Sequence, residues 1–83
     1  MDSIARTPKQ IGAVLRRTRR QRTLTQAELG ARMSVRQATV SKLEAGEPAT
    51  QLRTLMDALA ALGLELVIRP RSKAASPDIE ELF

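Results

Sequence analysis

The stretch TQAELGARMSVRQATVSKLEAG, residues 25–46, carries two short helix patterns separated by a turn. Its first four residues form a capping box, in which the Thr25 side chain reaches forward into the helix and the Glu28 side chain reaches back. This box predicts a helix of about eight residues that ends at Met33. After the turn SVR, the segment QATVSKLEA predicts a second short helix, which Gly46 ends in a left-handed conformation. Two short helices joined by such a turn, after a longer helix, predict a helix-turn-helix reader of DNA.

Longer helices are predicted on both sides of this unit. The segment TPKQ, residues 7–10, is a second capping box with Pro8 at the first helical position, and it opens a helix over residues 8–21. Thr50 is expected to cap a fourth helix, which Gly63 ends. An apolar stripe along that helix is the predicted main core, formed by Leu52, Leu55, Met56, Leu59 and Leu62.

The hydrophobic period changes in LELVIR, residues 64–69, where Leu64, Leu66 and Ile68 alternate with other side chains as they do in a β-strand. A single strand leaves its backbone N–H and C=O groups unpaired. We therefore expect it to pair with the same strand of a second subunit in a homodimer. A fifth helical turn or an irregular loop is the alternative. The predicted fold class is mainly α, with four to five helices and one C-terminal strand that pairs across the dimer.

Two end segments, residues 1–6 and 71–83, are predicted to be flexible around one folded domain, residues 7–70. The C-terminal segment is rich in Ser, Ala and Pro and has no sustained period, which is typical of a disordered tail. Phe83, the only aromatic residue of the chain, follows Leu82 there and lies beside the acids Asp78, Glu80 and Glu81. We expect this tail to serve something other than the core of the chain.

The composition favours an anionic partner and disfavours metal chemistry. The chain has 14 Lys and Arg residues, 9 Asp and Glu residues, and a formal net charge of +5. Five arginines gather in RRTRRQR, residues 16–22, which favours a polyanion such as DNA, although a solvated basic helix face is the alternative. Without cysteine or histidine, the usual zinc and thiolate sites are excluded, so no metal or cofactor is expected. We expect a cytoplasmic protein, associated with the nucleoid when bound to DNA, since no membrane span or signal peptide is apparent.

Val40 and Leu43 are predicted to face inward from the second helix of the unit, which leaves its polar side chains outward. The residues expected to read base edges in the major groove are Arg36, Gln37, Ala38, Ser41 and Lys42. Glutamine pairs with adenine, arginine or lysine with guanine, and alanine packs on the thymine methyl group. The residues expected at phosphates are Gln26, Thr39, Arg17 and Arg20. Each residue taken singly could be an ordinary solvated side chain.

The stretch TQAELGARMSVRQATVSKLEAG, residues 25–46, resembles the helix-turn-helix of the Xre/Cro/phage repressor family. The positions that match the family pattern are Gln26, Gly30, Val40, Glu44 and Gly46. Gly30 is expected where the first helix of the unit passes close to the second. Ser34 stands where the family usually has a turn glycine, and serine can adopt that conformation at some energetic cost.

A narrower resemblance extends along most of the chain. The segments RQATVSKLE and LGLELVIRPR, with the acidic tail that ends in an aromatic residue, are similar to HipB-type antitoxins, partners of HipA-type serine/threonine kinase toxins. The resemblance implies a homodimer that binds an inverted-repeat operator and represses its own operon. It also implies that Leu82 and Phe83 dock on the toxin, although the family prototype has tryptophan at the last position. It places at base edges Arg36, Gln37, Ala38 and Ser41.

The sequence is also compatible with other functions. The alternatives are a stand-alone Xre-type repressor without a toxin, an antitoxin to a different class of toxin, and a tail that a protease recognises. An enzyme is not expected, because a chain without His or Cys offers no evident pair of nucleophile and base. Glu28 and Glu44 are better explained as a capping residue and as a packing or salt-bridging residue.

Overall fold

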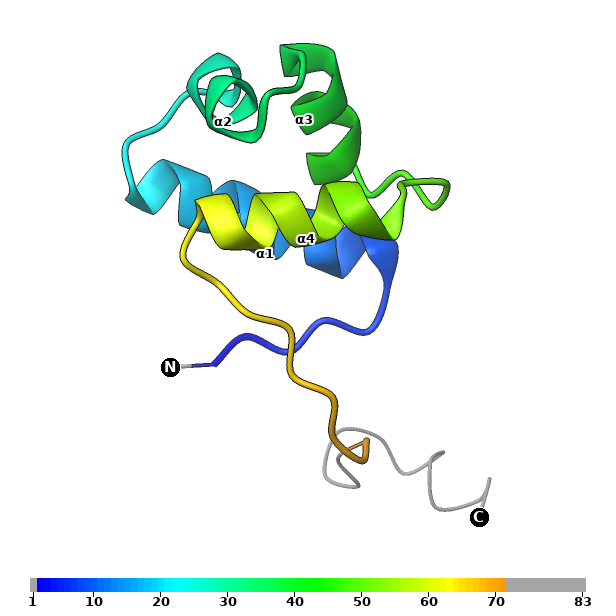
Figure 1. The fold of residues 1–83 in the computed structure, drawn as a ribbon. Helices are drawn as coiled ribbons and strands as arrows, with labels where there is room; N and C mark the ends of the chain where they lie inside the picture. Colours follow the sequence, from blue (N-terminus) through cyan, green and yellow to red (C-terminus); the bar gives the residue numbers. More distant parts are fainter. Residues whose placement is uncertain (1, 72–83) are drawn as a thin grey trace.

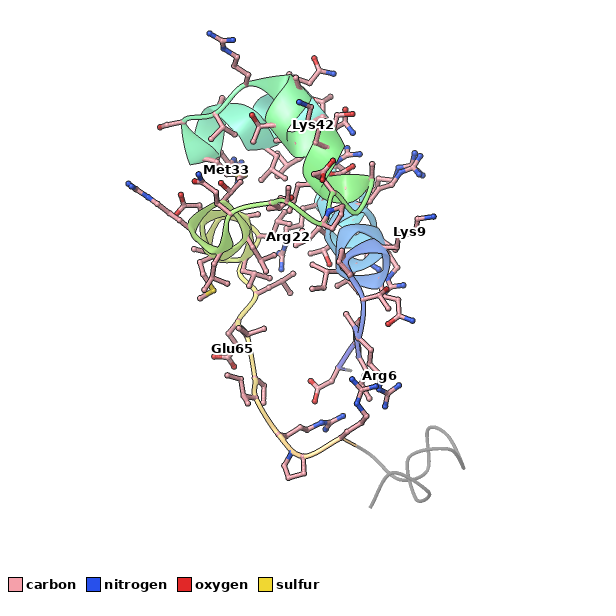
Figure 2. All side chains as sticks on the ribbon, turned by 90° about the vertical axis from the view of Figure 1, so that its right-hand side faces the viewer. Arg6, Lys9, Arg22, Met33, Lys42 and Glu65 are labelled. Atoms are coloured by element: carbon pink, nitrogen blue, oxygen red, sulfur yellow. The ribbon has the colours of Figure 1, made fainter. Side chains whose placement is uncertain are left out.

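The structure, a computed structural model, describes residues 2–71 and contains four helices there. They are α1 (Pro8–Gln21), α2 (Gln26–Met33), α3 (Gln37–Glu44) and α4 (Leu52–Ala61). Helices α1 and α4 run alongside each other, and α2 and α3 lie across them on one side (Figures 1 and 2). The extended segments at the two ends of the described chain lie on the opposite side (Figure 1). The four predicted helices and the mainly α fold class are confirmed.

The first two helices begin as their capping patterns predict. The Thr7 side chain accepts a hydrogen bond from the Gln10 N–H at 3.1 Å, and the Gln10 side chain accepts one from the Arg6 N–H at 2.6 Å. In α2 the capping box is reciprocal, with Thr25 and Glu28 each accepting from the other's N–H at 3.0 Å. The hydrogen bond from the Thr25 backbone lowers the pKa of the Glu28 carboxyl. The cap therefore stabilises the fold above the unfolded pKa of about 4.3, and this contribution is lost as the pH falls through the lowered folded pKa.

All four helices end in Schellman motifs, in which the left-handed residue and its successor donate to carbonyls three and five residues earlier. Glycines occupy the left-handed position after α3 and α4, where Gly46 has a φ of 83° and Gly63 a φ of 69°. After α1 and α2 the position holds Thr23 and Ser34, with φ values of 54° and 60°. The turn of the helix-turn-helix thus forms with serine in the left-handed conformation, as expected.

Replacing Thr23 with glycine should stabilise the protein. A β-branched residue with positive φ is an outlier, and left-handed backbone costs an L-residue about 1–2 kcal/mol. Glycine removes that cost, but the greater conformational freedom of glycine in the unfolded chain costs about 0.5–1 kcal/mol. The free energy of unfolding should therefore rise by about 0.5–1 kcal/mol. Urea denaturation should show a raised midpoint for Thr23→Gly and a lowered midpoint for Gly63→Ala, which introduces the strain that Thr23→Gly removes. An unchanged or lower midpoint for Thr23→Gly would show that the Thr23 conformation carries no strain.

The core lies between α2 and α3 on one side and α1 and α4 on the other (Figure 1). Leu15, Leu29, Val40 and Leu62 are almost fully buried. The other buried apolar residues pack around them, and they are Leu24, Met33, Leu43, Ala58 and Leu59. The inward positions of Val40 and Leu43 are confirmed.

The predicted apolar stripe of α4 is only half correct. Leu59 and Leu62 are buried and Leu55 packs against the core, whereas Leu52 is 67% exposed and Met56 is 43% exposed. The C-terminal half of α4 lies beneath α2, and its first turn extends away from α2 (Figure 1). The start of the helix also differs from the prediction, because the N-cap is Gln51 and makes no side-chain capping hydrogen bond. Thr50 is therefore not the cap.

No strand is formed among residues 2–71, so the predicted strand over residues 64–69 is absent from the single chain. Leu64 packs against the core of its own chain, whereas Leu66, Val67 and Ile68 are exposed. An isolated strand has no hydrogen-bonding partner within one chain, which is why the segment stays irregular here. Pairing across a dimer remains a prediction. Among the described helices, none is long and apolar enough to cross a membrane.

Candidate nucleic-acid interface

The outward face of α3 presents a compact set of polar side chains. Gln37, Ala38, Ser41 and Lys42 are all exposed and repeat at the spacing of one helix face. Arg36 is the exposed N-cap residue directly before them. Lys42 lies on the side of α3 that points away from α1 and α4 (Figure 2). The five residues predicted to read bases therefore share one open surface.

The turn between α2 and α3 holds this surface at a defined angle to α2. The Val35 N–H donates to the Gly30 carbonyl at 2.8 Å. A Cβ atom at Gly30 would lie only 2.8 Å from the Val35 carbonyl oxygen, so no larger residue fits without moving the turn. The close approach that was expected at Gly30 is confirmed.

A buried ion pair lies between α1 and α3, on the inner side of the candidate interface. The Arg19 guanidinium donates to the Glu44 carboxylate at 2.6 Å and 3.1 Å, and it also donates to the Leu24 carbonyl at 2.7 Å. The side chains of Arg19 and Glu44 are 9% and 3% exposed. Hydrogen bonds with Glu44 raise the pKa of Arg19 above its already high ordinary value. The pair links the end of α1 to the end of α3.

The ion pair continues into the predicted contact residues. The Gln26 amide donates to the Glu44 carboxylate at 3.1 Å, and its carbonyl oxygen accepts a long contact from the Gln37 amide at 3.5 Å. This arrangement places Gln26, at the start of α2, against Gln37, at the start of α3. Gln26 is half-buried and Gln37 is exposed. The network therefore holds Gln26 firmly and reaches the exposed Gln37 only through this long contact.

Arg19 differs from the other arginines of RRTRRQR, the run expected to favour a polyanion, because its side chain is buried and paired with Glu44. The remaining exposed arginines of α1 line a groove beside the α3 end of the molecule, which we call the arginine groove. It is lined by Ala13, Arg16, Arg17, Arg20, Gln21 and Glu44. Arg16 borders it together with the two arginines predicted to contact phosphate, and the sequence analysis did not single it out.

The predicted phosphate residues are not equivalent in the structure. Arg17 and Arg20 are exposed on α1, and Arg17 donates to the Ser3 hydroxyl at 2.8 Å. Thr39 is half-buried on α3. Arg17 therefore faces the N-terminal segment, whereas Gln26 is at the α2 end of the buried network.

Two other groups of predicted contacts lie elsewhere. Of the residues predicted for dimerisation, Leu66 is 50% exposed and Ile68 is 91% exposed, and both could contact a second subunit. Leu64 contributes to the core of its own chain. The predicted toxin-docking residues Leu82 and Phe83 lie outside the described residues.

With this geometry in view, comparisons with known proteins identify the fold. Residues 15–68 match the helix-turn-helix family. The chain belongs to this family. Its α2 and α3 form the helix-turn-helix unit, so α3 takes the position of the helix that enters the major groove in this class of domain. A search among curated proteins found no matching sequence.

Several solved structures of HipB resemble this helix-turn-helix chain over most of its length. A HipB variant in an O2 20mer complex aligns with a TM-score of 0.79 and 29% identity, covering 87% of this chain and 100% of that chain. HipB in a HipA–HipB–O2–O3 complex aligns with a TM-score of 0.79 and 27% identity, over 86% and 100%. HipB in an O4 20mer complex gives 0.80 and 27%, again over 86% and 100%. The similarity to HipB-type proteins that the sequence suggested is confirmed at the level of fold and sequence.

One residue that positions this helix-turn-helix was missed by the sequence analysis. Gly12 is buried in α1 where that helix meets the end of α3. A Cβ atom there would overlap the Glu44 carbonyl group and lie 2.8 Å from the Leu43 carbonyl oxygen. Glycine therefore allows α1 to approach the backbone next to the buried ion pair. Nothing in a local helix pattern marks such a contact, because it depends on a residue more than thirty positions away.

Proposed function

We propose that this protein is an antitoxin and transcriptional autorepressor, which binds an inverted-repeat operator as a dimer and neutralises a HipA-type serine/threonine kinase toxin. The observation that carries the proposal is the open face of α3, where Gln37 lies beside Gln26, whose amide the buried Glu44 holds. The likeness to HipB in complexes with 20mers and with HipA supports both halves of it. Such a regulator acts on the nucleoid in the cytoplasm and catalyses no reaction.

The DNA-binding half assigns base edges to α3 and phosphates to its surroundings. Gln37 offers a bidentate amide for adenine, while Arg36 and Lys42 offer donors for guanine. Gln26 and Arg20 are assigned to phosphates on either side of α3, with Thr39 and Arg17 as further contacts. Pairing of residues 64–69 of one subunit with the same residues of the other would cover Leu66 and Ile68. A dimer of this kind places two α3 helices about 34 Å apart, one turn of DNA.

Replacing Gln37 with alanine should weaken binding to the operator by about 1–3 kcal/mol and relax the preference at particular base pairs. The operator is first obtained by selection from a random duplex library with the full chain, and we expect an inverted repeat. Binding of the wild type and of Gln37→Ala is then measured on the selected site and on a random duplex. Gln37→Ala should change affinity for the random duplex little.

Arg20→Gln is the matched control for this prediction. Loss of a phosphate contact should weaken binding to both duplexes alike and reduce the slope of log K against log salt by about 1. Equal weakening of specific and random binding by Gln37→Ala would contradict its assignment as a base-reading residue.

The toxin-binding half assigns Leu82 and Phe83 to an apolar pocket of the toxin, with neighbouring carboxylates meeting basic groups. Affinity capture from native cells should recover a kinase-like protein with the full chain as bait. A bait that ends at Ala75 should recover much less of it. The tag is placed at the N-terminus, so that the tail stays free, and mass spectrometry identifies the captured proteins.

A point variant separates the aromatic side chain from the length of the tail. Phe83→Ala in the full chain should reduce capture nearly as much as truncation, whereas Ser76→Ala should leave it unchanged. If the full chain and the chain that ends at Ala75 both capture only DNA and the protein itself, the toxin assignment fails. The chain is then a stand-alone Xre-type repressor.

A further inference from the structure

The arginine groove on α1 carries positive charge that no acidic side chain of the described region neutralises. Arg16, Arg17 and Arg20 are exposed along it. Within residues 2–71 the only ion pair is the one between Arg19 and Glu44. Glu44 is the one acid at the edge of the groove, and its carboxylate is already taken up by Arg19 and Gln26.

The complementary charge lies in the C-terminal segment, residues 72–83. Residues 1–71 contain 13 basic and 6 acidic side chains, a formal charge of +7. Residues 72–83 contain one lysine and three acids, a formal charge of −2. The three acids lie within four positions and are followed or separated by apolar residues, in the order Asp78, Ile79, Glu80, Glu81, Leu82 and Phe83. The sequence of the segment therefore suits a surface that offers both cations and apolar contact.

The arginine groove offers both kinds of contact. It is lined by Ala13 and by three arginines. Arginine carries an apolar methylene stem, and its guanidinium group supplies charge and a flat face for an aromatic ring. Guanidinium groups also match carboxylates better than ammonium groups do, because they donate in a planar fork. The acids and Phe83 of the tail could thus be accommodated together.

The side that the groove faces and the length of the tail both favour an encounter between them. Arg17 contacts Ser3 of the N-terminal extended segment, so one edge of the groove faces the side on which both end segments lie (Figure 1). Glu80 follows Arg71 by nine positions, and a stretch of this length spans up to about 30 Å when extended. A tether of this length gives an effective concentration on the order of 1 mM, which allows even weak docking to be populated.

We propose that the acids Asp78, Glu80 and Glu81 dock in the arginine groove of their own chain and compete there with DNA phosphates. This inference rests on the proposed function, because it makes the tail a regulator of the DNA contact. A partner that takes Leu82 and Phe83 would withdraw the acids from the groove and free its arginines for DNA.

A spin label on the tail tests the docking directly. The chain has no cysteine, so Leu82→Cys gives a single attachment site for a nitroxide. Labelled, ¹⁵N-enriched protein is diluted into an excess of unlabelled wild type, so that any effect arises within one chain. At low salt the amide signals of residues 13–21 should broaden, and the broadening should disappear in Asp78→Asn/Glu80→Gln/Glu81→Gln. Broadening confined to other elements, or none, would overturn the proposal.

Competition with DNA is measured on a random duplex. The variant Asp78→Asn/Glu80→Gln/Glu81→Gln should bind the random duplex about tenfold more tightly than the wild type at 0.05 M salt. The gain in affinity should be smaller at higher salt. The matched control, Asp2→Asn/Asp57→Asn/Glu65→Gln, makes the same change of net charge at exposed acids of the described region. Its gain should be much smaller. In an Arg16→Gln/Arg17→Gln/Arg20→Gln background, neutralising the tail should bring no more gain than the control variant does.

The two proposals fail separately in these experiments. Equal gains from the tail variant and the control variant would overturn competition at the groove, while preference for the selected inverted repeat would be untouched. If the wild type showed no preference for an inverted repeat over a random duplex, the proposed function would be overturned instead. The spin label would still report whether the tail docks.

Discussion

Replacing Glu44 with alanine should lower the free energy of unfolding by about 3–5 kcal/mol. The substitution leaves the Arg19 guanidinium charged and buried with only the Leu24 carbonyl as a partner. Removal of one member of a buried pair costs this much because the remaining charge stays out of water without compensation. A domain of this size has a total stability of about 4–12 kcal/mol, so the loss amounts to at least a quarter of it.

Urea denaturation followed by circular dichroism measures this loss. Glu65→Ala is the control, because Glu65 is exposed, and it should change stability by no more than about 0.5 kcal/mol. The double variant Arg19→Met/Glu44→Leu removes both charges and should recover most or all of the stability. If Glu44→Ala behaves like Glu65→Ala, the pair does not hold α1 to α3.

The double variant also separates stability from recognition. It should fold, yet Gln26 would lose the carboxylate that holds its amide, and Gln37 would lose an oriented neighbour. We expect weaker discrimination between the selected operator and random duplex in a protein of normal stability. Unchanged discrimination would show that Gln26 needs no support from Glu44.

The second large effect is expected at Gly12. Gly12→Val should lower the free energy of unfolding by about 3 kcal/mol, near the upper end for overpacked sites, because the new side chain meets backbone carbonyls of α3. Backbone atoms cannot rotate aside as a flexible side chain can. The helices must separate instead, which strains the neighbouring ion pair.

Ala13→Val is the matched control on the same helix, one residue further on and exposed. It should cost only the difference in helix propensity, about 0.5 kcal/mol. Gly12→Ala is a further check, because glycine to alanine in an exposed helix gains about 1 kcal/mol, whereas here the change should destabilise. The close approach of α1 to α3 would be refuted if Gly12→Val were as stable as Ala13→Val.

Much of the fold could be predicted from local sequence because its signals act over a few residues. Thr25 and Glu28 cap each other within one turn of backbone, and Gly46 supplies a left-handed residue at the end of α3. The spacing of Val40 and Leu43 indicated which face of α3 is buried. The outward set that begins at Gln37 followed from that face, so the candidate reading surface was also visible in the sequence.

Only the tertiary structure decided which side chains are buried or paired where helices meet. Arg19 looks like its neighbours in the basic run, and only the position of Glu44 makes it a buried partner. Leu52 continues the apolar stripe of α4, yet it is exposed because α2 covers only the other half of the helix. Gly12 carries no local turn signal and is required by the backbone of α3. Local sequence determines how each helix begins and ends, whereas burial and ion pairing depend on contacts between segments distant in the chain, which sequence periodicity does not record.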